Sequence, residues 1–170
     1  MAKPHIVGLG EWNQMVHSFH DESDRGAAIL AGSFAEHALG TYLMNRVVDK
    51  RVGDKLFGSV GPLSSFSQRI AAAYAFGLIT RAQYDEFESI RQARNHFAHH
   101  PLDASFESSE VQKHTVKLGI FKNTTLDIYT ELRVRHRMAY LLGCGHLCGS
   151  LLGEIEAEEV NSTEKSDGKA

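Results

Sequence analysis

The sequence predicts an all-α protein, a single-domain bundle of five to six helices. Proline occurs only at positions 4, 62 and 101, so long spans are free of the residue that breaks helices. β-branched residues are sparse and do not alternate with polar ones over any useful length, so strands are not predicted. With 170 residues, 42% of them hydrophobic, the chain can bury one core. We expect this domain at residues 1–160 and a disordered polar tail at 161–170.

The composition is that of a soluble globular protein and narrows the function classes. The net charge is −3, so no basic excess indicates a nucleic-acid-binding protein. No run approaches the ~18 consecutive apolar residues of a membrane span, and residues 1–10 lack the apolar core of a secretory signal. Cys144 and Cys148 are spaced for reduced thiols on a helix rather than for a disulfide framework. We expect a cytoplasmic protein without membrane contact.

Residues 80–99 form the helix with the clearest signals. Thr80 and Gln83 have the spacing of a capping box, in which two side chains satisfy two free backbone donors. Pro101 disfavours helical geometry at the residue before it, so the helix should end near His99. Its inward seam is Tyr84, Phe87, Ile90, Phe97 and Ala98, with Ala93 and Arg94 between them.

Two helices are predicted before this one. Residues 11–19 are expected to form a short helix, and acidic residues at 21–24 mark the start of a long helix that runs to about Asp49. Alanine, glycine and serine are frequent at residues 26–35, so another helix can approach closely. The inward positions of the long helix are Ala27, Leu30, Ala31, Phe34, Ala38, Tyr42 and Met44 to Val48.

The other elements follow from capping and breaking residues. Residues 49–65, rich in glycine, are predicted as a loop whose Leu56 and Phe57 reach the core. Ser65 and Gln68 form a second capping box for a helix with Phe66, Ile70, Ala73 and Tyr74 inward, which Gly77 ends. Helices are predicted at 109–119 and 131–158, and residues 120–129 remain unassigned.

Arg94, Asn95 and His99 are the candidate reactive group. A guanidinium binds phosphate in a bidentate manner and a histidine exchanges protons near neutral pH, which are the requirements for cleavage at an RNA 2′-hydroxyl. On a straight helix, however, Arg94 and His99 point about 140° apart at about 100° per residue, so they would meet only at a frayed end or across a dimer axis. The alternative is structural: Arg94 pairs with Glu86 or Glu88, and His99 stabilises the helix C-terminus.

Two further clusters are better explained by structure than by metal binding. His96, His99 and His100 have spacing compatible with a shared metal, but no carboxylate follows until Asp103. Cationic histidines also stabilise the last turn of a helix. Cys144 and Cys148 share a helix face that His146 does not, so helix packing explains them. We expect no metal and no cofactor.

Direct reading of DNA is doubtful. Residues 73–77 and the following helix have the outline of a helix-turn-helix, but the second helix carries acidic residues early, where phosphates would lie: Asp85, Glu86 and Glu88. The basic clusters are Arg46, Lys50, Arg51 and Lys55, and Arg133, Arg135 and Arg137; both are expected to be solvated helix faces.

Five stretches together resemble the mannitol operon repressor (MltR-like) family. They are residues 21–28, 56–58, 61–70, 75–79 and 90–100, of which Gly-Pro-Leu-Ser-Ser-Phe-Ser and Arg-Asn-His-Phe-Ala-His are the most specific. The resemblance implies a small, all-helical, bacterial negative regulator of transcription. The Arg-Asn-x-x-Ala-His element is also similar to that of the higher eukaryote and prokaryote nucleotide-binding (HEPN) superfamily. There the element lies at a dimer interface and in some members cleaves RNA. Pro101 stands where some of those ribonucleases carry a tyrosine.

Two functional hypotheses follow. The first is a regulator that acts through a protein partner or as a homodimer, without a helix-turn-helix. The alternative is a metal-independent HEPN-type ribonuclease, in which Arg94 binds phosphate, His99 is the acid/base, Asn95 orients and Glu36 assists. Arg94, Asn95, His99, His100 and Arg25 lie in the matched stretches and are the candidate binding residues.

Overall fold

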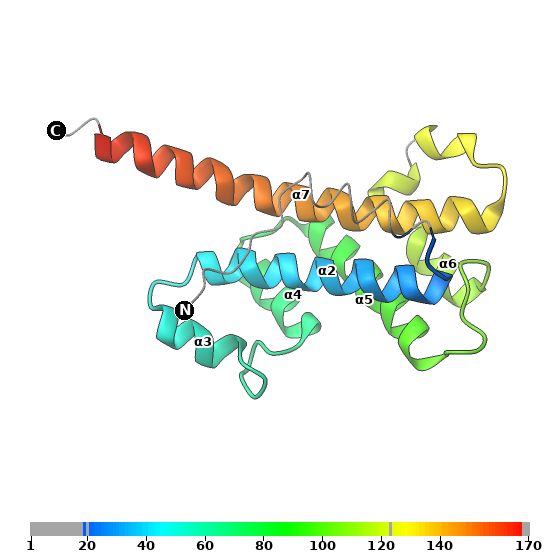
Figure 1. The fold of residues 1–170 in the computed structure, drawn as a ribbon, viewed down its shortest axis with the longest axis horizontal. Coiled ribbons are helices and arrows are strands. Elements are labelled where there is room, and N and C mark those ends of the chain that lie inside the picture. The colour runs from blue at the N-terminus through cyan, green and yellow to red at the C-terminus, as the bar shows by residue number, and fades with distance from the viewer. Residues whose placement is uncertain (1–18, 20, 123, 168–170) are drawn as a thin grey trace.

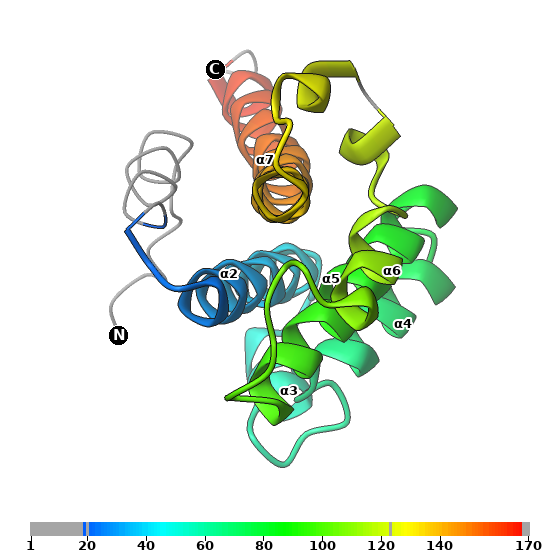
Figure 2. The ribbon, with the colours of Figure 1, turned by 90° about the vertical axis from the view of Figure 1, so that its right-hand side faces the viewer.

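The structure, a computed structural model, describes residue 19, residues 21–122 and residues 124–167. These residues are all-helical and include no strand, as predicted. The helices are α2 (Asp24–Asn45), α3 (Lys50–Phe57), α4 (Phe66–Ala75), α5 (Arg81–His99), α6 (Ser109–Thr115) and α7 (Leu132–Asp167), with the short 3₁₀ helices η1 (Gly119–Lys122) and η2 (Thr124–Ile128) before α7. Helices α2 and α7 lie side by side along the long axis, and α5 packs against both (Figures 1 and 2). Helix α4 packs on α2 and α5, and α6 packs on α5 and α7.

Both capping boxes are present. The amide of Thr80 donates to Gln83 Oε1 at 2.8 Å, the amide of Gln83 donates to the Thr80 hydroxyl at 3.2 Å, and Ser65 and Gln68 do the same for α4. Gly77 has φ +69°, a conformation that only glycine adopts without strain, and it ends the turn between α4 and α5. Helix α5 ends at His99, as Pro101 predicted.

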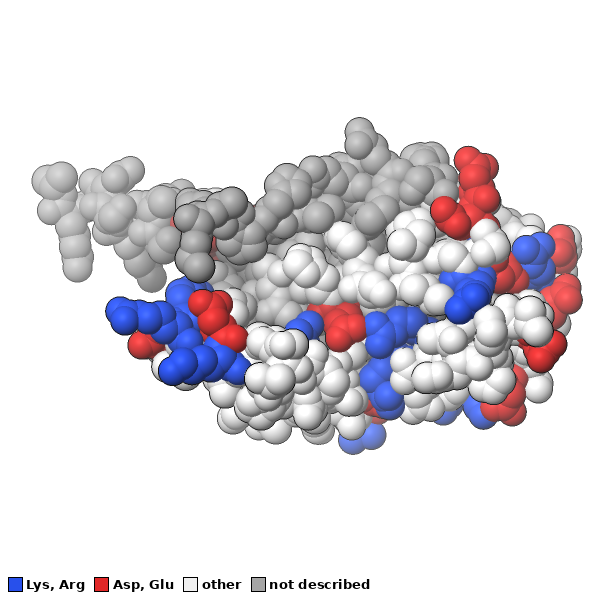
Figure 3. All heavy atoms as spheres, turned by 60° about the horizontal axis from the view of Figure 1, so that its bottom comes forward, with Lys and Arg blue, Asp and Glu red and all other residues white. Residues whose placement is uncertain are grey.

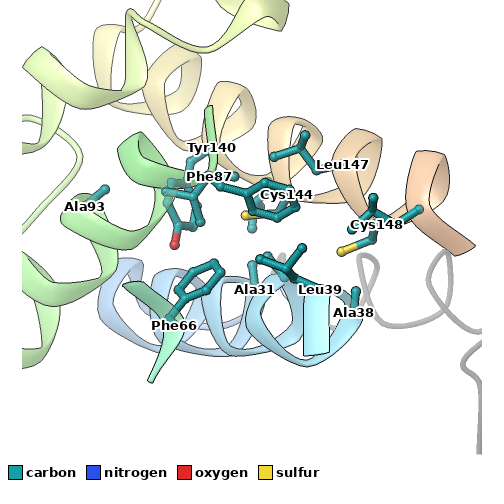
Figure 4. Packing of buried hydrophobic residues seen from close by; sticks show 14 of the residues in the cluster. Ala31, Ala38, Leu39, Phe66, Phe87, Ala93, Tyr140, Cys144, Leu147 and Cys148 are labelled. Atoms are coloured by element: carbon teal, nitrogen blue, oxygen red, sulfur yellow. The ribbon is translucent and has the colours of Figure 1, made fainter. Parts of the chain in front are cut away.

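The core is built where small residues of α2 meet larger residues of the other helices (Figure 4). Ala31, Ala38 and Leu39 of α2 face Tyr140, Cys144, Leu147 and Cys148 of α7, with Phe66 and Phe87 from α4 and α5 beside them. Both thiols are buried and free, and burial raises the pKa of Cys148 to about 12. The cysteines are therefore packing residues, in agreement with the sequence-based interpretation.

Several predicted boundaries and burial assignments were wrong. The predicted loop at 49–65 contains α3, because Asp49 caps a helix by accepting from the amide of Arg51 at 2.8 Å. Gly53 lies inside α3, where an added Cβ would be 2.6 Å from Met44 Sδ, so this glycine serves close packing rather than a turn. Five residues predicted to face inward are exposed: Leu30, Asn45, Val48, Tyr74 and Ala98.

The helix ends also differ from the prediction. Helix α2 stops at Asn45 and α6 at Thr115, and the unassigned residues 120–129 contribute to η1 and η2. Helix α7 continues to Asp167, past the predicted end at Glu158 and into the stretch predicted as a disordered tail. The predicted helix at 11–19 lies, except for Phe19, outside the described residues.

Helix α7 is also notable for its apolar composition. Between Leu132 and Val160 it is long and apolar enough to cross a membrane by length and composition. Over half of its most apolar stretch is buried inside the bundle, including Tyr140, Leu147 and Leu151. A helix at the core of a soluble protein has the same composition, so this feature is explained by packing.

A buried carboxylate joins the start of α2 to the start of α7. Asp24 accepts from Arg137 at 2.8 Å, from Arg133 at 2.9 and 3.0 Å and from the amide of Phe106 at 3.1 Å. Burial on its own raises the pKa of Asp24, but the hydrogen bonds from Arg133, Phe106 and Arg137 outweigh it and lower the pKa below the ordinary 3.8. The negative charge of Asp24 therefore stabilises the fold at neutral pH.

We predict that Asp24→Asn lowers the free energy of unfolding by about 3–5 kcal/mol, because it leaves the buried Arg137 without its carboxylate. Urea denaturation followed by circular dichroism measures this. Asp127→Asn removes the partner of the more exposed Arg135 and should cost less than about 1 kcal/mol. Equal losses in the two variants would contradict a structural role specific to Asp24.

A buried histidine holds the segment from α6 to η2 against α7. His136 Nδ1 lies 2.6 Å from the hydroxyl of Thr115, and its ring stacks on Phe121 with centroids 4.9 Å apart. Burial, and then the nearby charge of Arg135, lower the pKa of His136 below its ordinary 6.5. The imidazole is therefore held in its neutral form.

We predict that acid weakens the fold partly through this histidine. As the pH falls below 6.5, the unfolded chain binds the proton before native His136 does, so a contribution that is complete above pH 6.5 is lost as the pH falls. His136→Gln should flatten the plot of unfolding free energy against pH between pH 7 and pH 5. His146→Gln, on an exposed position of the same helix, should retain the parent slope.

Candidate functional site

A three-residue cluster at the middle of α2 contains two of the predicted site residues. Arg94 of α5 donates through Nη1 to Glu36 Oε2 at 2.5 Å, and Nη1 of Arg69 of α4 lies 3.9 Å from Glu36 Oε1. Arg69 also donates through Nε to the carbonyl of Leu63 at 2.9 Å. One carboxylate thus connects α2, α4 and α5.

Glycines on α2 make room for this cluster. Gly32 and Gly40 lie one turn before and one turn after Glu36. A Cβ at Gly32 would be 2.9 Å from Arg94 Cδ and 2.6 Å from the hydroxyl of Tyr140, and one at Gly40 would be 3.0 Å from Arg69 Nη1. The glycines therefore let both arginines lie flat against the helix.

The cluster is semi-buried and carries one uncompensated positive charge. The side chains of Arg94, Glu36 and Arg69 are 20%, 22% and 17% exposed. The Arg94 guanidinium lies 5.4 Å from the centre of the Phe66 ring, and that of Arg69 lies 5.8 Å from Phe57. Its contacts show how it joins three helices, and the carbonyls of Leu63 and Ser64, which accept from Arg69, balance part of the excess charge.

The remaining residues of the predicted site lie apart from the cluster. Asn95 is half-buried, and His99 and His100 are exposed. Because α5 is regular up to His99 and Arg94 turns toward α2, the ribonuclease pair does not converge within one chain. Arg25 is exposed near the start of α2.

The histidines at the end of α5 interact with one another. The His96 and His100 rings stack with centroids 4.3 Å apart, and His100 Nδ1 lies 3.0 Å from the carbonyl of His96. Burial, and then His100, lower the pKa of His96. In the part of the chain that the structure describes, no three His, Cys, Asp or Glu residues form a group able to bind a metal.

Two sequence-based interpretations of charged residues need correction. Arg94 does not pair with Glu86 or Glu88: Glu86 accepts from the amide of Gly119, and Glu88 pairs with Arg91. The cluster of Arg133, Arg135 and Arg137, expected to be a solvated face, is paired instead: Arg133 and Arg137 bind Asp24, and Arg135 binds Asp127. In the other cluster Arg46 binds Glu158, whereas Lys50, Arg51 and Lys55 are exposed, as expected. Sequence reasoning also missed Arg69, although the spacing of Gly32, Glu36 and Gly40 was an available signal.

A groove of about 580 Å³ lies between α5 and α6. Its lining residues are Tyr84, Asp85, Glu88, Ser89, Gln92, His114, Val116 and Lys117. Asp85 and Glu88 are already paired with Arg81 and Arg91, and the Ser89 hydroxyl donates to the carbonyl of Asp85. The groove therefore does not present the free acidic group that a cationic ligand would need.

Helices α4 and α5 have the outline of a helix-turn-helix. Helix α5 packs against α2, α4, α6 and α7. A recognition helix must leave one side open to enter the major groove, and here the early turns of α5 carry acidic residues. Figure 3 shows basic and acidic side chains interspersed over this side of the molecule. Neither feature suits binding to phosphates.

The fold is that of the MltR-like proteins, an all-helical single-domain bundle, as the sequence resemblance implied. One solved structure that shares it is the MtlR–HPr complex from Escherichia coli, with a TM-score of 0.65, 18% identity, and coverage of 83% of this chain and 98% of that one. A second is YggD from Shigella flexneri 2a str. 2457T, described as a possible transcriptional regulator, with a TM-score of 0.69, 14% identity, and coverage of 89% and 99%. No family model matches the chain, and no curated protein matches it at a significant level.

We predict that the two ends of the Arg-x4-His pattern differ in their effect on stability. Arg94→Ala should lower the free energy of unfolding by about 1–3 kcal/mol, because it leaves semi-buried Glu36 without its closest partner. His99→Ala, at an exposed position, should change it by less than about 0.5 kcal/mol. Urea denaturation of both variants tests this, and a loss at His99 as large as that at Arg94 would contradict it.

Proposed function

We propose that the protein is a bacterial negative regulator of transcription that acts by binding another protein rather than by reading DNA. The observation that carries the proposal is the shared fold with MtlR, which was solved in complex with HPr, over 98% of the length of the MtlR chain. The possible transcriptional regulator YggD supports the same class. The five matched stretches of sequence support a negative role.

The placement of charge supports contact with a protein rather than with DNA. A DNA-binding protein needs several free cations on one face, because neutralised phosphates supply most of the affinity. Here Arg94, Arg133 and Arg137 are held by carboxylates of the same chain. The exposed cations of α3, Lys50, Arg51 and Lys55, share their segment with the acidic Asp49 and Asp54. The proposal also includes a cytoplasmic location, which the free thiols of Cys144 and Cys148 support.

We predict that purified protein binds a bacterial HPr saturably in isothermal titration calorimetry and binds operator-length duplex DNA weakly at the same salt concentration. An Arg94→Ala variant, checked for folding, should bind HPr as the parent does if the Arg94 cluster is structural. Tight DNA binding that falls steeply as salt is added would overturn the mechanism. If the titration with HPr gives no heat of binding, HPr is not the partner.

A further inference from the structure

The cations of α3 have no carboxylate partner among the described residues. We name Lys50, Arg51, Val52 and Lys55 the basic tip. Lys50 donates to the carbonyl of Met44 at 2.6 Å, but in that part of the chain neither Arg51 nor Lys55 has an ion-pair partner. Figure 3 shows basic side chains, with acidic ones among them, at the end of the molecule where α3 lies; Asp49 and Asp54 are the acidic residues of this segment.

The basic tip also has apolar surface. Val52 is 50% exposed on α3, and Val48 and Val60, in the segments on either side, are fully exposed. On α3, Val52 and Lys55 are three residues apart and therefore lie on one face. Valines contribute nothing to phosphate binding, whereas an apolar centre with charged neighbours is typical of a contact with protein.

The same chain carries an acidic surface that complements this one. Helix α7 presents Glu154, Glu156, Glu158 and Glu159 within a stretch that has no Lys or Arg, and all four are exposed; we name them the acidic end. Glu154 accepts from the Tyr42 hydroxyl at 2.6 Å and Glu158 pairs with Arg46, yet their side chains remain 49% and 55% exposed.

Both surfaces lie at the same end of the long axis, where α7 projects beyond the other helices (Figure 1). A two-fold rotation next to this end brings the basic tip of each copy to the acidic end of the other. The contact then forms twice and leaves neither surface open to a third copy, as in most soluble homodimers. We infer that the protein forms a homodimer in which the basic tip docks on the acidic end of α7 in a second copy.

The test is size-exclusion chromatography with light scattering at low and high salt. The parent should have twice the mass of one chain at about 0.05 M salt and move toward the mass of one chain at about 0.5 M, where screening weakens charge pairing. Arg51→Glu/Lys55→Glu should have the mass of one chain at low salt, and Glu156→Lys should weaken the dimer in the same direction.

The matched control is Lys113→Glu/Lys117→Glu, which changes the net charge equally in and just after α6, at the opposite end, and should remain dimeric. Circular dichroism confirms that each variant is folded. A parent with the mass of one chain at low salt overturns the inference. A tip variant that stays dimeric overturns it as well. The readout is independent of HPr binding, so failure here is distinct from failure of the proposed function.

Discussion

The close contact of α2 with α7 is the constraint on which the rest of the structure depends. Ala27, Ala28, Ala31 and Ala35 of α2 are fully buried, and the absence of larger side chains lets α7 lie directly on them. The hydroxyl of Tyr140 is then close enough to donate to the carbonyl of Ala28 at 3.0 Å. Larger residues on the other helices fill the space that this contact leaves.

Two carboxylates on α2 fix how the other helices attach to it. Asp24 binds two arginines of α7, and Glu36 lies against one arginine each from α4 and α5. In both places more positive than negative charge converges, and the excess is partly balanced by backbone carbonyls such as those of Phe19 and Leu63. Much of the arginine content of the chain is therefore used within the bundle, which is consistent with a regulator that works through protein contacts.

Features that depend on neighbouring residues in the chain were predicted correctly from the sequence. Features that depend on distant residues were missed. The capping boxes at Thr80 and Ser65 and the stop at Pro101 are local, and they were correct. Gly53 indicated a loop by its local preference, but tertiary packing against Met44 placed it inside α3. The partner of Arg94 could not be found from spacing along α5, because Glu36 lies 58 residues away. The resemblance to MltR-like proteins identified the fold, which local patterns alone placed only in the all-α class.

The contact between Asp24 and Arg137 joins residues 113 positions apart in the chain. During synthesis α2 is made before α7, whose residues cover its alanine-rich side. Until α7 follows, the nascent chain exposes that side of α2, and it cannot reach its native core from α2, α3 and α4 alone. The bundle is therefore completed only once α7 has been made, and a chain whose synthesis stops before Arg137 exposes the α2 surface that α7 covers.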